Sequence, residues 1–211
     1  MDFRTERIKQ MLLLLQKAKI RKRQPLLQWQ FVACDYKTDN RIPSCGEREF
    51  GEYERWGRTP EQHAWFLRHV QVPEYWTRGD VRINLRTGFE GDNNPRIPQF
   101  IAYIDGQMEQ GLDGNHTELY LGTRRDVDLA LYAYSGMDGV PFEFHAELQC
   151  VDLDCEGLYY DLCVPLGILE FSDPVSKSYA DILHLLNEAV NRMNCCEPDR
   201  DAFIEGVRAA R

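Results

Sequence analysis

Three segments of this chain alternate apolar and polar residues, and this alternation limits the available folds more than any other feature of the sequence. In each segment the apolar side chains recur at every second position, which places them on one face of a half-buried strand. The apolar positions are Val81, Ile83 and Leu85, then Val127, Leu129, Leu131 and Ala133, and finally Phe142, Phe144, Ala146, Leu148 and Cys150.

Further apolar runs of strand length lie at residues 100–104, 117–121 and 158–164. The region therefore predicts about six or seven short strands with turn residues between them. No helical run separates these strands, which argues against a parallel α/β architecture. We predict a mainly β protein, built as an antiparallel β-sandwich of the jelly-roll-like type.

Aromatic residues are abundant, with ten Phe, ten Tyr and four Trp making up 11% of the 211 residues. They are densest from Pro25 to Trp76, where periodicity is weak and Pro and Gly recur. This segment predicts short strands joined by aromatic-rich coil. Aromatic rings pack well on pleated surfaces, so burial in a β core explains them more simply than contact with sugar faces does.

Helical periodicity occurs only toward the two ends of the chain. Residues 4–20 predict a helix whose apolar stripe comprises Ile8, Met11, Leu12, Leu15 and Ala18. Asp173 followed by Pro174 predicts the start of a second helix, because a carboxylate suits the N-cap and proline suits the first helical position. The apolar face of that helix continues from Val175 to Met193.

These patterns divide the chain into three parts: an N-terminal helix at 1–24, an aromatic-rich β-sandwich domain at 25–171 and a helical linker at 172–211. A small sandwich alone is a poor cover for the C-terminal helices. The sequence also stops at Arg211 without an obvious end to the fold. We interpret the chain as a piece of a longer protein.

The net charge of −9 makes nucleic acid and anionic membranes poor partners, because an acidic surface repels phosphate. The apolar run from Met11 to Leu15 is far shorter than the roughly 20 residues of a membrane span. Charges of mixed sign precede it, unlike the basic start of a signal peptide. These features predict a cytoplasmic protein.

The seven cysteines are odd in number and irregularly spaced. Reduced thiols in the cytosol are the simplest interpretation of that pattern. Structural and catalytic zinc sites use closely paired ligands, and the sequence contains no CxxC or HxxxH pair. We therefore expect no metal site in this chain.

The densest group of polar side chains lies between two strand-like runs, from Phe100 to Leu121. Two Asp-Gly pairs, Asp105-Gly106 and Asp113-Gly114, suit turns that need a positive φ. Three residues of the second turn, Asp113, Asn115 and His116, are candidate contacts for a cleft or a carbohydrate. The alternative is purely structural, because Asp and Asn are favoured in turns for conformational reasons.

A search for catalytic motifs finds none of the familiar sets. The sequence contains no GxSxG, HExxH, P-loop or GxGxxG pattern. Pairs of carboxylates are plentiful, but 34 acidic residues produce such pairs by chance. The chain itself is expected to contain no catalytic residue.

The stretch GLDGNHTELYL, from Gly111 to Leu121, resembles the N-terminal ancillary domain of the glycoside hydrolase family 38 α-mannosidases, in the branch of the cytosolic and bacterial enzymes. The resemblance covers roughly residues 45–195. It extends to these segments: Trp56-Gly57, Trp65-Phe66, Val72-Pro73, the strand from Val81 to Gly88, Val151-Asp152 and Tyr159-Tyr160-Asp161-Leu162.

The resemblance implies a β-sandwich that precedes a zinc-dependent catalytic domain beyond Arg211. The zinc ligands, nucleophile and acid/base of the family lie in that later domain, so no catalytic residue and no cofactor is assigned to this chain. The whole protein would be a retaining α-mannosidase. Its partners would be the catalytic domain of the same chain and a mannoside substrate.

Two other functions remain open. The domain could be an independent carbohydrate-binding module, although this idea rests on analogy of fold. It could also be an oligomerisation domain, because the wide apolar face of residues 8–18 could pack on a second copy.

Overall fold

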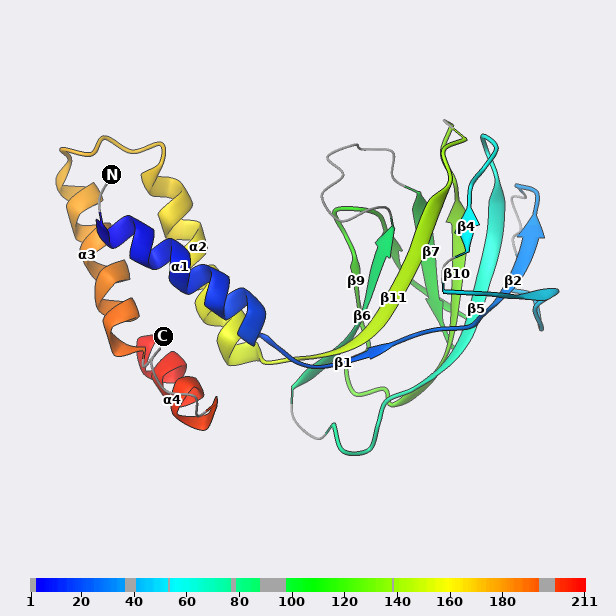
Figure 1. Ribbon diagram of the computed structural model, residues 1–211, viewed down its shortest axis with the longest axis horizontal. Coiled ribbons are helices and arrows are strands. Elements are labelled where there is room, and N and C mark those ends of the chain that lie inside the picture. Colours follow the sequence, from blue (N-terminus) through cyan, green and yellow to red (C-terminus); the bar gives the residue numbers. More distant parts are fainter. Residues whose placement is uncertain are drawn as a thin grey trace. The chain divides into compact units, whose positions relative to one another are not determined.

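The computed structural model describes residues 3–36, 41–52, 54–76, 79–87, 98–137, 139–193 and 200–211 (Figure 1). The chain forms two compact units. The first, which we call the helical unit, combines Met1–Arg21 with Val151–Arg211, and the second, the β unit, comprises Lys22–Cys150. Among the described residues, no helix is both long and apolar enough to cross a membrane.

The β unit contains two sheets, and the antiparallel β-sandwich predicted from the sequence is confirmed. The first sheet has the order β1 (Ile20–Pro25), β11 (Phe142–Val151), β6 (Asp80–Thr87), β9 (Glu118–Tyr120), with β4 (Arg55–Trp56) paired to β11. The six-stranded sheet has the order β3 (Arg48–Phe50), β2 (Trp29–Cys34), β5 (His63–Gln71), β10 (Asp126–Tyr134), β7 (Gln99–Ile104), β8 (Gln107–Leu112).

The alternation in the sequence explains how the core forms between these sheets. The apolar positions of β6 and β10 are buried in one continuous cluster, together with Phe142, Ala146, Leu148 and Cys150 of β11. At its centre lies Phe66 of β5, which is fully buried and packs edge-on against the rings of Phe50 and Trp56 at 5.1 and 5.7 Å. Edge-to-face ring pairs of this kind add to the stabilisation from area burial alone.

The sequence predicted only short strands and coil up to Trp76, and this is wrong for β5. The strand spans nine residues and pairs with both β2 and β10. Its inward residues join the main core, while Trp65 on the opposite face joins a small outer cluster with Ala130 and Tyr132. Because both faces of the strand are covered, its sequence does not alternate.

The helical unit consists of α1 (Phe3–Ala18), α2 (Leu153–Leu169), α3 (Lys177–Arg192) and α4 (Arg200–Ala210). The predicted N-terminal helix is confirmed by α1, which lies against α2 and α3 (Figure 1). Its buried residues Ile8, Met11 and Leu15 join the core of the helical unit. An ion pair joins Lys19, just after α1, to Glu156 of α2 at 3.5 Å.

The strand predicted at residues 158–164 is wrong, because these residues belong to α2. The Asp152 side chain caps this helix by accepting the N–H groups of Asp154 and Cys155. Its buried residues, Cys155, Leu158, Leu162, Leu166 and Leu169, follow helical spacing. The opposite side of α2 is also apolar at several exposed positions, so the run shows no clear period.

The predicted start at Asp173-Pro174 is also wrong. Helix α3 begins at Lys177, and the Ser176 hydroxyl caps it by accepting the N–H of Tyr179 at 3.1 Å. Asp173 instead accepts the N–H of Val175 at 3.1 Å and closes a turn before the helix. Residues 194–199, between α3 and α4, lie outside the described residues.

Replacing Phe66 should test the central position of this ring in the core. We expect Phe66→Ala to lower the free energy of unfolding by about 3–5 kcal/mol, because it leaves a cavity among packed rings. Phe171→Ala is the matched control, since Phe171 is 92% exposed and should change stability little. Urea denaturation of the two variants would measure the difference, and equal losses would contradict this account of the core.

Candidate functional site

The two Asp-Gly pairs of the polar region form different turns. Asp105 and Gly106, between β7 and β8, have φ angles of 51° and 81°. Two successive positive φ angles are typical of a two-residue hairpin turn, so the first predicted turn is confirmed. Among the described residues, those with positive φ do not include Asp113 or Gly114, so the expected positive-φ turn there is wrong.

The loop after β8 is instead organised by the Asp113 carboxylate. Its Oδ1 atom accepts the backbone N–H groups of Asn115 and His116, each at 2.8 Å, and lies 3.0 Å from His116 Nδ1. The Asp113 N–H in turn donates to the His116 carbonyl at 3.1 Å. Asp113 therefore acts as a turn residue that closes its own loop.

The hydrogen bonds of this loop also lower the pKa of the Asp113 carboxyl group. The backbone N–H of His116, followed by that of Asn115, lowers the pKa of Asp113 below its ordinary value of 3.8. A hydrogen bond to the charged form favours that form, so Asp113 stays ionised at neutral pH. An ionised carboxylate already used by three donors is a poor choice for a general acid or nucleophile.

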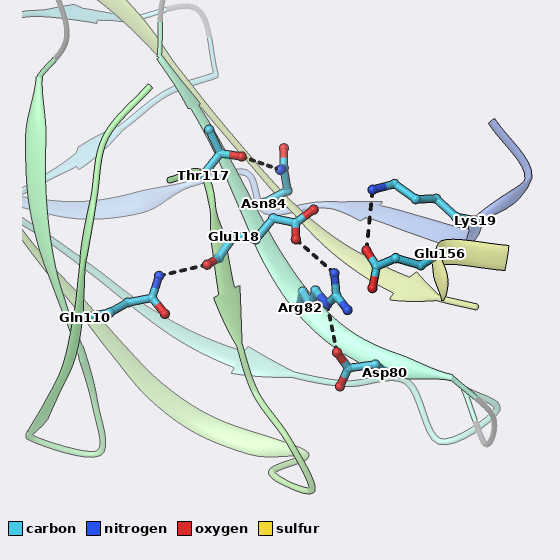
Figure 2. Close-up of polar contacts among 8 residues, drawn as sticks. All are labelled: Lys19, Asp80, Arg82, Asn84, Gln110, Thr117, Glu118 and Glu156. Carbon is cyan, nitrogen blue, oxygen red and sulfur yellow. Dashed lines mark hydrogen bonds and ion pairs between the residues drawn. The ribbon is translucent and has the colours of Figure 1, made fainter. Parts of the chain in front are cut away.

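The strand that follows the loop is held in place by polar side chains from β6 and β8 (Figure 2). Arg82 donates to Asp80 at 2.8 Å and to Glu118 at 2.9 Å, and its side chain is 3% exposed. Asn84 donates to the Thr117 hydroxyl at 3.1 Å, and Gln110 donates to the Glu118 carbonyl at 2.8 Å. These contacts fix the loop at the point where it enters β9.

The structure brings Asp113 and His116 into contact, and the backbone N–H of Asn115 donates to the same Asp113 carboxylate. The His116 side chain is 74% exposed, so the imidazole is oriented by Asp113 and presented to solvent. The geometry suits contact with another surface or ligand. Catalysis by this pair is poorly supported, because the carboxylate is occupied by the loop itself.

Sequence reasoning missed a cleft in the β unit, at the opposite end of β8 from this loop. The cleft has a volume of about 530 Å³, and its lining includes Ile42–Gly46, Leu67, His69, Asp105, Asp128 and Ala130. Asp113, Asn115 and His116 are not among the lining residues. The residues are far apart in the sequence, and only strand pairing brings them together.

His69 in this cleft contacts two carboxylates, and they shift its pKa. Its Nδ1 lies 2.8 Å from Asp128 and its Nε2 lies 3.2 Å from Asp126. The hydrogen bond to Asp128, with the negative charges of Asp126, Asp128 and Asp105, raises the pKa of His69 above 6.5. The described residues contain no group of three or more His, Cys, Asp or Glu side chains arranged to hold a metal ion.

The raised pKa of His69 predicts a pH dependence of stability. A group whose pKa is higher in the folded state stabilises that state fully below its unfolded pKa, here 6.5. Wild-type protein should exceed His69→Gln in free energy of unfolding below pH 6.5, and this advantage should disappear as pH rises through the folded-state pKa. Denaturation at a series of pH values would measure it, and an advantage that grows with pH would contradict the assignment.

The lowered pKa of Asp113 predicts the opposite dependence. The stabilisation of the loop should be present above pH 3.8 and lost as pH falls through the lower folded-state pKa. Asp113→Asn keeps an acceptor oxygen without the charge, so wild-type protein should exceed it in stability only above that range. The titration of the His116 amide signal would report the folded-state pKa directly, and a midpoint above 3.8 would contradict this view.

Comparison with known proteins gives no family assignment: no protein-family model matches the sequence, and no curated protein matches it. Similar solved structures include the β-glucuronidase from Ruminococcus gnavus in complex with D-glucaro 1,5-lactone, with 8% identity and a TM-score of 0.41. This match covers 63% of our chain and 30% of that chain. The crystal structure of the Ruminococcus gnavus enzyme alone gives 9% identity, a TM-score of 0.39 and coverage of 63% and 29%. Our chain thus spans less than a third of those proteins, and similarity at this TM-score supports no argument about function.

Proposed function

We propose that this chain is the N-terminal accessory domain of a family 38 α-mannosidase, in which it supports a catalytic domain. The residues that resemble the family, Gly111–Leu121, form a loop and strand held on the β-sandwich. One observation favours an accessory role over a catalytic one. The Asp113 carboxylate is used by the N–H groups of its own loop, and it orients the exposed His116 imidazole outward.

In this proposal the hydrolysis of terminal α-mannosides takes place in a separate, zinc-dependent catalytic domain of the same protein. The described residues offer no cluster of ligands that fits zinc, so no step of the reaction is assigned to them. The accessory domain would contact its catalytic neighbour through the His116 loop. An odd number of irregularly spaced cysteines supports a reducing compartment such as the cytoplasm.

The oligomerisation alternative is less well supported than the sequence suggested. The stripe at Ile8, Met11 and Leu15 is buried against α2 and α3 of the same chain. Leu13 and Leu14 remain 52% and 45% exposed, so assembly through α1 stays a prediction that these two residues would have to carry. Sugar binding by the domain itself is favoured by a more specific observation, the cleft beside His69.

A longer protein that continues through the catalytic domain would test the main proposal. It should hydrolyse 4-nitrophenyl α-D-mannopyranoside, and chelation of zinc should abolish that activity. His116→Ala should lower the activity roughly 5- to 10-fold without changing the melting temperature, as expected for one lost contact. His145→Ala is the matched control, because His145 lies on β11 and its imidazole is paired with Glu143 of the same strand.

Three results would separate the parts of this proposal. Absence of mannoside hydrolysis in the folded longer protein would reject the α-mannosidase assignment. Full activity of His116→Ala would reject only the role of the loop. A lower melting temperature that accounts for the whole fall in activity would mean that His116 acts on folding alone.

A further inference from the structure

The cleft beside His69 lies on the outer face of the six-stranded sheet. The sheet forms its floor, and two walls rise on either side. Leu67 of β5 and Ala130 of β10 are paired residues on the outer face and form the floor. Tyr103 of β7 lies opposite Ala130 on the same face and packs against Trp65 at 5.5 Å. The floor is therefore apolar and continues into an aromatic cluster.

One wall of the cleft is held tightly against the sheet. A Cβ atom at Gly46 would lie 2.5 Å from the Gln30 Cβ atom, so only glycine allows the segment Ile42–Gly46 to approach β2 this closely. The Glu47 N–H also donates to the Phe31 carbonyl at 3.0 Å. The other wall is the hairpin turn Asp105–Gly106, whose Asp105 carboxylate accepts the Asp128 N–H at 2.9 Å.

The polar end of the cleft is rich in hydrogen-bond acceptors. Asp128 is 83% exposed, and in the described part of the chain its hydrogen bond to His69 uses only the Oδ1 atom. The Oδ2 atom can therefore accept a hydrogen bond from a ligand. Three carboxylates, those of Asp105, Asp126 and Asp128, lie near the His69 imidazole, so this end of the cleft disfavours a bound anion. The lining of the cleft also includes one cationic residue, Arg68.

We propose that this cleft binds a neutral pyranoside, with hydroxyl groups at the Asp128 carboxylate and the apolar face over Leu67 and Ala130. The volume of about 530 Å³ falls within the range of ligand sites, roughly 300–1,000 Å³, which combine an apolar lining with a few fixed polar groups. Paired hydroxyl groups supply the donors that a carboxylate requires. The choice of a mannoside as ligand rests on the proposed function above.

Titration of the isotope-labelled 211-residue chain with methyl α-D-mannopyranoside, followed by amide shifts, would test the proposal. We expect saturable shifts with a millimolar dissociation constant at the cleft residues, including Ser44–Gly46, His69, Gly106 and Asp128–Ala130. Asp128→Ala should weaken binding roughly 10-fold, as for the loss of a charged hydrogen bond. Asp181→Ala, which removes an exposed aspartate of α3, is the matched control and should bind like wild type.

Two further probes decide the chemistry of the ligand. Sodium D-glucuronate, an anion of similar size, should cause no shift at these residues. Shifts with L-arginine amide but none with the mannoside would show an acidic cation site and overturn the proposal. Absence of saturable shifts with the mannoside, or an unchanged affinity in folded Asp128→Ala, would also overturn it.

Because this test measures binding to the 211-residue chain alone, its failure is independent of mannoside hydrolysis by the longer protein. Binding without hydrolysis would support a sugar-binding domain of another enzyme. Hydrolysis without binding would support an accessory domain that touches no sugar at this cleft.

Discussion

The position of β10 between β5 and β7 is the constraint on which the β unit depends. Every residue of β10 from Asp126 to Tyr134 pairs with a residue of β5. Its odd-numbered positions from Val127 to Ala133 face the main core, and its even-numbered positions carry the outer cluster and the cleft. A slip of one residue would expose the core and bury Asp128, so core packing and the polar face specify the same register.

The strands that could be predicted from the sequence are those in which polar residues alternate with the apolar ones. This period of two is visible in β6 and β11 and in the first part of β10, from Asp126 to Leu129. The period disappears in β5 because Trp65 and Phe66 are both buried, on opposite faces. It is also hidden in α2, where Val164 and Ile168 are exposed although Leu162 and Leu166 are buried. Periodicity reports the contrast between two faces, and these elements have little contrast.

The candidate loop could be found in the sequence because its parts are neighbours in the chain. Asp113, Asn115 and His116 interact within four residues, so their type and spacing already indicate a turn. The cleft could not be found in this way. His69 meets Asp128 only through the β5–β10 pairing, and Gly46 lines the cleft because of its close approach to Gln30. No sequence pattern groups the residues of the cleft until the strand order is known.

The order of the two units along the chain has a consequence for folding. The β unit is inserted between α1 and α2, so residues 22–150 must be synthesised before α1 can meet its helical partners. The strands at the two ends of the insertion, β1 and β11, are neighbours in one sheet. Once the sandwich has folded, it replaces a long flexible loop with two adjacent chain ends, which removes most of the entropy of loop closure. The folded β unit would then keep the chain segments that lead to α1 and α2 close together, and the helical unit would assemble after it.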